Sequence, residues 1–322
     1  MLNIAVIGAG NIGARHVQSI LSNMDSLLTI VDPSEKVKNN VGSIIGIDNL
    51  KKIEWISELS QIKSIPDIAI VATDAKPRKD IVLNLLDMGV KKFLLEKIVC
   101  QSTSQYKELL DAVEYNSAKA WVNFPRRYSP IYHQLKKLFK SDKEPIRMLV
   151  DAGNLGIACG AIHLIDLFQF ICGTKNLFLD KECLKLKIIQ TKRKDYIDFA
   201  GNLIIHSDNN STLYLNFTDD DFWPLVEVYR NTTRYCIVDG DHKLSKMALK
   251  KNHWQWEEIE PVVSPVYVSQ ISHQVIKDIK NNNDCNMPTL HEAYQIHKLL
   301  LDTLLNNYRE NVDKVANLVP VT

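Results

Sequence analysis

The N-terminal part of the chain alternates short apolar runs with amphipathic segments. The apolar runs show no regular alternation with polar residues and lie within residues 3–8, 27–32, 68–73 and 91–96. Continuous runs of this length are typical of strands in a parallel sheet whose two faces are both covered. Apolar residues recur with helical spacing over residues 12–23, 76–88 and 104–116. The series predicts a doubly wound parallel sheet, closed by a short strand at residues 120–124.

The pattern changes after Pro125. Helical spacing predicts helices at residues 131–139, 160–173, 267–281 and 289–307. Apolar and polar residues alternate over residues 183–190, 201–207, 211–217, 227–240 and 253–260. Such alternation predicts an antiparallel sheet with one face on a core. We therefore expect an α/β fold: a nucleotide-binding domain over residues 1–122, followed over residues 123–322 by an α+β domain with a largely antiparallel open sheet.

Composition narrows the function classes. Of the 322 residues, 24% are charged, and the formal net charge is +1, so no global field favours nucleic acid or an anionic membrane. No apolar run approaches the roughly 18 residues that a membrane-spanning helix requires. The six cysteines are scattered without a CxxC pair, and the N-terminus lacks the basic start of a signal peptide. We expect a cytoplasmic protein with reduced thiols and no metal site.

The segment "GAGNIG" has the spacing of a dinucleotide-binding loop. Gly8, Gly10 and Gly13 follow a predicted strand and open a predicted helix, which is the context that this motif requires. The glycines permit a tight turn, close approach of a pyrophosphate and close packing of helix on strand. The exposed N–H groups at the helix start, at Asn11 and Ile12, are expected to receive the anion. An ordinary glycine-rich turn that binds no cofactor remains the alternative.

Asp32 ends the next predicted strand, where the carboxylate can accept hydrogen bonds from a ribose hydroxyl. Its charge would repel a 2′-phosphate, so the loop favours NAD over NADP as the cofactor. The first predicted domain is thus an NAD-binding Rossmann domain. Asp32 could instead serve only as a turn former in "VDPS".

Two further strand ends place polar residues at the same edge of the sheet. Thr73 ends one predicted strand, and Glu96 and Lys97 end another. Ligands of open α/β sheets bind in the crevice outside the carboxyl ends of the strands. Lys97 is therefore expected beside the nicotinamide, with Glu96 as its neighbour. A solvated lysine at a strand end is the alternative, since lysine is seldom buried unless paired.

Several motifs resemble the glucose-fructose oxidoreductase / inositol dehydrogenase / rhizopine-catabolism family (Gfo/Idh/MocA). They are "VIGAGNIGARH", "VATDAKPR", "LLEKI", "VNFPRRYSP", "HLIDL" and the closing "MPTLHEAYQIHKLLLD", and they occur in the family's order over almost the whole chain. The resemblance implies an NAD(P)-dependent dehydrogenase acting on CH–OH groups. Its substrate would be a sugar, cyclitol or nucleotide sugar.

The resemblance also implies roles for individual residues. Lys97 would hydrogen-bond the reacting oxygen and stabilise its charge, and His163 would be the general acid/base. Asp166 lies on the same helical face as His163 and would orient the imidazole or bind substrate. Asn123 and Arg127 would contact cofactor or substrate in the crevice. Structural roles stay open for His163 as a core histidine, for Asp166 as a ligand of backbone, and for Arg127 as an ion pair.

The chain departs from the family pattern at two positions. Ile98 replaces the proline of Glu-Lys-Pro, and because a cis bond before a non-proline residue costs about 2.5–4 kcal/mol, we expect a trans peptide there. Cys159 replaces the acid of Asp-x-Gly-x-His, so the carboxylate that would act on His163 is absent from its usual place. We expect Cys159 to be a small buried residue, with a reactive thiol as the alternative.

The segment "AGNLGIACGAIHLIDLF" is similar to a subgroup of the family associated with surface-polysaccharide and sialic-acid-like sugar pathways. The leading hypothesis is therefore a sugar or nucleotide-sugar dehydrogenase. Two alternatives remain: a non-catalytic NAD-binding regulator and an NAD-dependent glycoside hydrolase of the same fold.

The second domain is expected to bind substrate and to form the oligomer. Three acids precede Phe222 and Trp223, either as a sugar platform or as a solvated acidic turn. Trp254 and Trp256 alternate onto one sheet face. Aromatic side chains are enriched at interfaces, and by resemblance the open sheet face would pair two protomers. We expect a homodimer or homotetramer.

Overall fold

The computed structural model divides the chain into two compact units. It describes residues 1–322 except 141–143, 154, 219, 221, 223, 231–232, 239–242, 251–252 and 260–266. The first unit comprises Met1–Pro125 and Val266–Tyr294, and the second comprises Arg126–Pro265 and Gln295–Thr322. The first segment thus ends close to the predicted boundary at residue 122. The segment Val266–Tyr294 belongs to the first unit, whereas the sequence-based division placed these residues in the second domain.

The first unit is a parallel sheet with helices in the connections. Its elements are β1 (Leu2–Ile7), α1 (Asn11–Asn23), β2 (Ser26–Val31), α2 (Glu35–Ile45), α3 (Ile47–Leu50), β3 (Glu54–Ile56), β4 (Ile68–Val71), α4 (Ala75–Asp87), β5 (Lys92–Leu95), α5 (Thr103–Tyr115), β6 (Lys119–Val122) and α8 (Val268–Asn282). The strands lie in the order β3-β2-β1-β4-β5-β6, and every pair is parallel. This confirms the predicted Rossmann fold.

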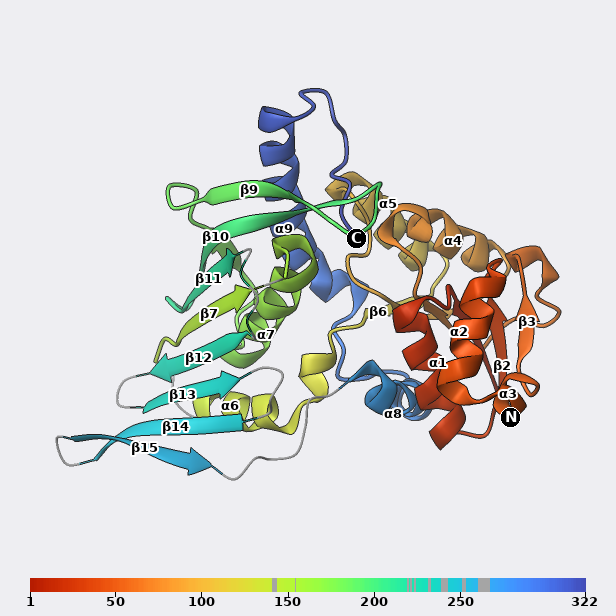
Figure 1. The fold of residues 1–322 in the computed structure, drawn as a ribbon, viewed down its shortest axis with the longest axis horizontal. Helices are drawn as coiled ribbons and strands as arrows, with labels where there is room; N and C mark the ends of the chain where they lie inside the picture. The colour runs from red at the N-terminus through yellow and green to blue at the C-terminus, as the bar shows by residue number, and fades with distance from the viewer. Residues whose placement is uncertain are drawn as a thin grey trace. The chain divides into compact units, whose positions relative to one another are not determined.

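The apolar runs form the strands because both faces of the sheet are covered. All four residues of β4 are buried, as are the last four of β1. Helix α1 packs against α2 and α8, whereas α4 packs against α5 (Figure 1). Two helix groups on a parallel sheet leave no strand face in water, which is why these strands carry no alternating polar residues.

The second unit is a mixed, mostly antiparallel sheet with helices. Its elements are α6 (Pro130–Lys140), β7 (Arg147–Gly153), a π-helical turn (Ile157–Ala161), α7 (Ile162–Cys172), β8 (Leu177–Leu179), β9 (Lys185–Gln190), β10 (Ile197–Ser207), β11 (Thr212–Thr218), β12 (Leu225–Arg230), β13 (Thr233–Val238), β14 (Lys243–Lys250) and β15 (His253–Ile259). Helix α9 (Leu290–Asn311) begins in the first unit and continues in the second.

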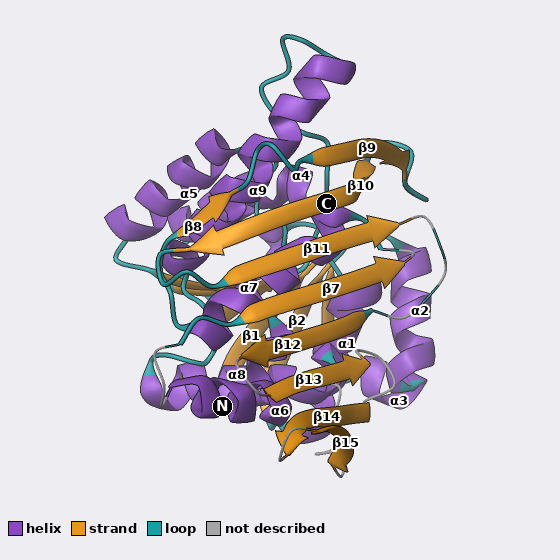
Figure 2. Cartoon of the chain, turned by 90° about the vertical axis from the view of Figure 1, so that its left-hand side faces the viewer, coloured by secondary structure: helices purple, strands orange, loops and turns teal. Residues whose placement is uncertain are grey.

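The sheet of the second unit follows the order β15-β14-β13-β12-β7-β11-β10-β8, with β9 beside β10. Only β7 and β11 run parallel among its described pairs, so the predicted fold class is confirmed. Residues 227–240, read from the sequence as one strand, form parts of β12 and β13. Figure 2 shows one face of this sheet toward the viewer, with α6 and α7 behind it.

Candidate functional site

The candidate cofactor residues lie along the carboxyl edge of the parallel sheet. One residue past four of the strands, the amides of Gly8, Ala72, Glu96 and Asn123 each donate to the carbonyl that ends a neighbouring strand, at 2.8–3.0 Å. The glycine loop and the ends of β4, β5 and β6 therefore form one continuous row. The chain leaves β1 for α1 and β4 for α4, which lie in different helix groups. The crevice of a doubly wound sheet opens between two such strands.

Two glycines of the loop hold positions that no larger residue can take. Gly8 has φ +82°, and a Cβ there would lie 2.8 Å from Thr73 Cγ2 and 2.9 Å from Thr73 N. A Cβ on Gly13 would lie 2.0 Å from the carbonyl oxygen of Gly8. At Gly10 no atom lies within 4 Å of the Cβ position, so this part of the loop is open. The loop thus has the close packing and the open approach that a pyrophosphate needs.

The start of α1 faces this opening without a competing cap. Gly10 is the N-cap residue, it offers no side-chain hydrogen bond, and Asn11 and Ile12 are exposed. The first N–H groups of a helix have no partner within the helix, and the helix dipole favours an anion there. These residues fit the diphosphate of NAD.

Asp32 is attached directly to the glycine loop. Its Oδ2 accepts from Ala9 N at 2.8 Å, and its Oδ1 accepts from Ser34 N at 2.9 Å. The indole Nε1 of Trp55 donates to the carbonyl of Asp32 at 2.9 Å. Each carboxylate oxygen has a second lone pair that a ribose hydroxyl could use. The residues present therefore also fit the ribose of NAD.

Glu96 points into the interior of the first unit. The residue is 7% exposed, and its Oε1 receives hydrogen bonds from His16 Nε2 at 3.0 Å and from Asn123 Nδ2 at 2.5 Å. Burial alone raises the pKa of Glu96, but the hydrogen bond and charge of His16, with Asn123 and Lys97, together lower it below the ordinary 4.5. The carboxylate is therefore ionised inside the protein. Lys97, the next residue, is half-buried.

The peptide between Lys97 and Ile98 is cis, so the expectation of a trans bond was wrong. The intrinsic preference is overridden by the surroundings. Ile98, Val99 and Cys100 are all fully buried, and the guanidinium of Arg78 donates both to the carbonyl of Ile98 and to the carbonyl of Thr73. Arg78 thus joins the ends of β4 and β5 from within α4.

In the second unit, Arg127 and Asp166 form a buried ion pair. Arg127 Nε lies 2.9 Å from Oδ2 of Asp166, and Nη2 lies 2.7 Å from Oδ1. Asp166 is 0% exposed on α7, and the guanidinium also lies 5.4 Å from the centre of the Phe170 ring. Two charge-assisted bonds from one planar group fix both side chains.

His163 lies on the first turn of α7 and is half-buried, between buried neighbours Ile162 and Leu164. The turn before it is held by Asp198 of β10, whose carboxylate accepts from Ala158 N at 2.7 Å and from Cys159 N at 3.2 Å. A carboxylate therefore binds the backbone of residues 158–159 although position 159 is a cysteine. Cys159 itself is only partly buried, so the expectation of a buried residue was wrong.

Three residues beside the predicted site were missed by sequence reasoning: His16, Arg78 and Asp198. His16 and Arg78 occur inside quoted motifs, and their signal was a charged or titratable residue on the buried face of a predicted helix. Asp198 gave no signal, because its partners are remote in sequence. Of the acidic segment before β12, Asp219, Asp221 and Trp223 lie outside the described residues, as do the side chains of Trp254 and Trp256 on β15.

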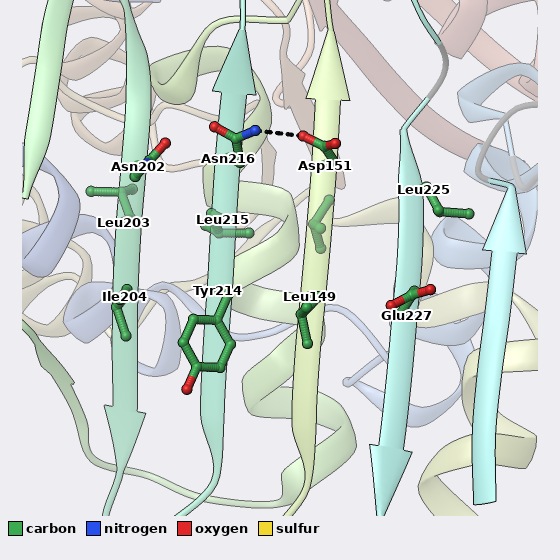
Figure 3. Close-up of a pocket in the computed structure, with 11 residues that line it drawn as sticks. Leu149, Asp151, Asn202, Leu203, Ile204, Tyr214, Leu215, Asn216, Leu225 and Glu227 are labelled. Carbon is green, nitrogen blue, oxygen red and sulfur yellow. Dashed lines mark hydrogen bonds between the residues drawn. The ribbon is translucent and has the colours of Figure 1, made fainter. Parts of the chain in front are cut away.

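The outer face of the second unit's sheet carries a shallow groove of about 420 Å³ (Figure 3). Tyr214 and Leu225 on its wall are 38% and 37% exposed. On the same face, Asn216 Nδ2 of β11 donates to Asp151 Oδ1 of the adjacent strand β7 at 2.7 Å. The face is therefore partly apolar and partly polar.

The described residues contain neither a cluster of metal ligands nor a helix that could span a membrane. No group of three or more His, Cys, Asp or Glu side chains in this part of the chain could hold a metal ion. Over the same residues, no helix combines the length and the apolar character needed to cross a membrane.

Comparison with known proteins places the first unit. The family described as "Oxidoreductase family, NAD-binding Rossmann fold" (GFO_IDH_MocA) matches residues 2–124. The scyllo-inositol 2-dehydrogenase (NAD(+)) of Bacillus subtilis is 22% identical over 191 residues, which cover 53% of this chain and 54% of that protein. The chain thus matches about half the length of this curated relative.

Two solved structures share the fold over nearly the whole chain. The UDP-N-acetylglucosamine 3-dehydrogenase GnnA of Acidithiobacillus ferrooxidans has a TM-score of 0.69 at 11% identity, covering 93% of this chain and 95% of that one. A super-repressor mutant of Gal80p from Saccharomyces cerevisiae has a TM-score of 0.71 at 14% identity, covering 96% of each chain. At these identities the likeness shows the fold alone.

Proposed function

Because residues 2–124 of this chain belong to the Gfo/Idh/MocA family of NAD-binding oxidoreductases, we propose that the protein is a sugar or nucleotide-sugar dehydrogenase. The observation that supports this best is the row of residues at the carboxyl edge of the parallel sheet. A dinucleotide and a substrate would meet along this row. It contains Gly8 and Asn11 of the glycine loop, Asp32 beside the loop, and Glu96 and Lys97 two strands away.

NAD, when bound, accepts the hydride from the carbon that bears the substrate hydroxyl. Gly8, Gly10 and Gly13 would leave room for its diphosphate, and the N–H groups of Asn11 and Ile12 would bind it. The carboxylate of Asp32 would accept hydrogen bonds from the adenosine ribose. Thr73, Glu96 and Lys97 would lie along the nicotinamide half of the site.

The remaining chemistry falls to the side chains of this chain. The ammonium of Lys97 would donate a hydrogen bond to the reacting oxygen and so stabilise its developing negative charge. The imidazole of His163 would take the hydroxyl proton during oxidation and return it during reduction. Both roles follow from the resemblance to the family motif.

Asp166 would act through Arg127. Its carboxylate holds Nε and Nη2 of the guanidinium, and an arginine has further N–H donors that a sugar hydroxyl or a phosphate can accept. Asn123 uses its Nδ2 on Glu96, which leaves its carbonyl oxygen as the group for a substrate hydroxyl.

The substrate class is tested by following NAD reduction over nucleotide sugars, free sugars and cyclitols. We expect turnover with a sugar or a nucleotide sugar, of the kind used in surface-polysaccharide or sialic-acid-like sugar biosynthesis. UDP-N-acetylglucosamine belongs in the panel, because a 3-dehydrogenase of this nucleotide sugar has the same fold. Turnover with cyclitols alone would contradict this proposal and favour the activity of the inositol dehydrogenase relative.

A second candidate is an NAD-binding regulator without turnover. Three observations favour it: the position of the usual acid holds Cys159, the carboxylate of Asp166 is taken up by Arg127, and the fold is shared with the Gal80p super-repressor. Calorimetry with NAD separates the two candidates. Tight NAD binding without turnover on the whole sugar panel would support the regulator.

The outer sheet face is proposed to pair protomers into a homodimer or homotetramer. Tyr214 and Leu225 expose more than a third of their surface on this face, and the face lies away from α6 and α7 (Figures 2 and 3). Burying such side chains against a second copy removes apolar surface from water.

A further inference from the structure

His16 is a titratable residue with no exposed surface. It lies on α1, within the helix that starts at the glycine loop, and it is 0% exposed. Its Nδ1 lies 2.8 Å from Ser272 Oγ on α8, and its Nε2 lies 3.0 Å from Glu96 Oε1 after β5. One imidazole therefore joins three elements of the first unit, none of which is adjacent to another in sequence.

The hydrogen bonds of His16 reach two partners on different elements. Ser272 Oγ lies 2.8 Å from His16 Nδ1 and 2.6 Å from the carbonyl oxygen of Val268 on the same helix. On the other side, the ionised carboxylate of Glu96 can only accept, so Nε2 must donate. The imidazole of His16 therefore binds the carboxylate of Glu96 through Nε2 and Ser272 through Nδ1.

A buried carboxylate is an unusual way to pack a helix on a sheet. Taking its charge out of water costs free energy that an apolar side chain would not incur. Glu96 is nevertheless buried here, with two donors, His16 Nε2 and Asn123 Nδ2, on the same carboxylate oxygen. Its location next to Lys97 gives a reason for it beyond packing.

The backbone that carries Lys97 is held on both sides. On one side the side chain of Glu96 is bound by His16 and Asn123. On the other side the carbonyl of Ile98 is bound by Arg78. Lys97 lies between these two anchors, and it is the one half-buried residue among the buried residues 93–100.

We propose that His16 is a positioning residue: its imidazole holds Glu96 and thereby fixes the backbone from which Lys97 reaches the substrate. The same imidazole ties this backbone to α1, whose first turn is the proposed diphosphate site, and to α8. The inference rests on the proposed function only as far as Lys97 is the group that acts. The position of residues 96–98 can be measured without any turnover.

Three variants separate the contacts of His16. Asn at position 16 reproduces the Nδ1 contact to Ser272 and removes the Nε2 contact to Glu96, whereas Gln can reach Glu96 with its amide N–H. Ser19→Ala is the matched control, because Ser19 Oγ bonds His273 Nδ1 at 3.1 Å, a second contact between α1 and α8 that does not involve Glu96. All three are made in the full chain.

The primary readout is amide hydrogen exchange over residues 96–100, with and without NAD. In His16→Asn we expect exchange at these amides to accelerate about 10-fold or more, since the segment loses an anchor. His16→Gln should restore most of the protection, and Ser19→Ala should leave the segment as in the wild type. A role confined to α1–α8 packing would instead give the same change in Ser19→Ala and His16→Asn.

The second readout is kinetic. If Lys97 is displaced, kcat should fall by about 100-fold in His16→Asn, because small misplacements of a reacting group have effects of this size. The KM for the sugar should change much less, and the affinity for NAD should stay within about 3-fold, since Gly8 to Gly13 are untouched. In a Lys97→Ala background, His16→Asn should have no further effect on kcat.

The outcomes distinguish this inference from the proposed function. Unchanged exchange at residues 96–100 in His16→Asn overturns the inference, whatever the wild type catalyses. Suppose instead that exchange accelerates in His16→Asn, but the wild type turns over no sugar. The proposed function is then contradicted, and the positioning role of His16 is retained. If His16→Asn does not fold, Glu96→Ala decides: it removes the partner of His16 Nε2, and no change in exchange at residues 97–100 then overturns the inference.

Discussion

Arg127 holds the carboxylate of Asp166 with two nitrogens, Nη2 at 2.7 Å and Nε at 2.9 Å, and Asp166 has no exposed surface. The family motif implies that both residues contact the substrate, but in this structure they bind each other. The pair joins the short 3₁₀ helix Pro125–Tyr128 to α7, the helix that bears His163.

Removing the carboxylate of Asp166 should destabilise the second unit. Asp166→Ala leaves the Arg127 guanidinium with 13% side-chain exposure and no anion, and breaking a buried pair in this way costs about 3–5 kcal/mol. Urea unfolding measures this loss. Lys298→Ala, in the exposed pair with Asp302, is the control and should leave the free energy of unfolding almost unchanged. An equally small effect of Asp166→Ala would mean that the pair contributes little.

The carboxylate of Asp32 should decide between NAD and NADP. Asp32→Ala removes the acceptor for Ala9 N and for the ribose, together with the charge that opposes a 2′-phosphate. We expect NAD affinity to fall by about 10-fold or more, since hydrogen bonds to a charged group are worth about 1.5–3 kcal/mol. NADP affinity should change far less or rise. Calorimetric titration of both dinucleotides checks this, and tighter binding of NADP by the wild type would contradict it.

Glu96 should make the first unit sensitive to acid. Its pKa in the folded protein lies below the ordinary 4.5, so its contribution to stability is present above that value. The contribution is lost as the pH falls from about 4.5 through the lowered pKa, because the folded carboxylate must then be protonated. Glu96→Gln removes this titration. The difference in free energy of unfolding between wild type and Glu96→Gln should shrink over that window, and a difference independent of pH would refute the assignment.

Lys97 and His163 should be needed for turnover but not for cofactor binding. Lys97→Ala and His163→Ala are each expected to lower kcat/KM by about 10²–10⁴-fold, the usual contribution of a positioned proton donor or acceptor. NAD affinity should stay close to wild type in both, since the glycine loop and Asp32 are unchanged. Lys92→Ala, at the start of β5, is the control for a lysine on the same strand. Wild-type rates in both variants would show that these assignments are wrong.

The open sheet face should control the oligomeric state. A chain of 36.7 kDa is expected to give the mass of a dimer or tetramer in light scattering at micromolar concentration. The double variant Ile204→Glu and Tyr214→Glu places two charges on the groove of Figure 3 and should give the monomer mass. Leu138→Glu, on the exposed face of α6, is the control and should not change the mass. A monomeric wild type contradicts the proposed assembly.

Local features of the chain were enough to predict the cofactor edge. A side chain on Gly8 would clash with Thr73 at the end of the neighbouring strand β4, and one on Gly13 would clash with the loop itself. The spacing of these glycines is therefore enough to predict the loop. Asp32, Glu96 and Asn123 come directly after apolar runs, and parallel strands end at one edge. Shorter or half-buried strands were missed, because three residues such as β3 (Glu54–Ile56) contain too little of a period to be recognised.

The sequence by itself determined the order of strands and helices, the position of the glycine loop and the polar residues at the strand ends, since each depends on a short stretch of neighbours. Only the tertiary structure decided what those residues touch. The contact of His16 with Ser272, the hold of Asp198 on residues 158–159 and the cis peptide before Ile98 all depend on chain segments remote in sequence. Burial in a common core brings such segments together, and no periodicity along the chain records which polar groups will meet there.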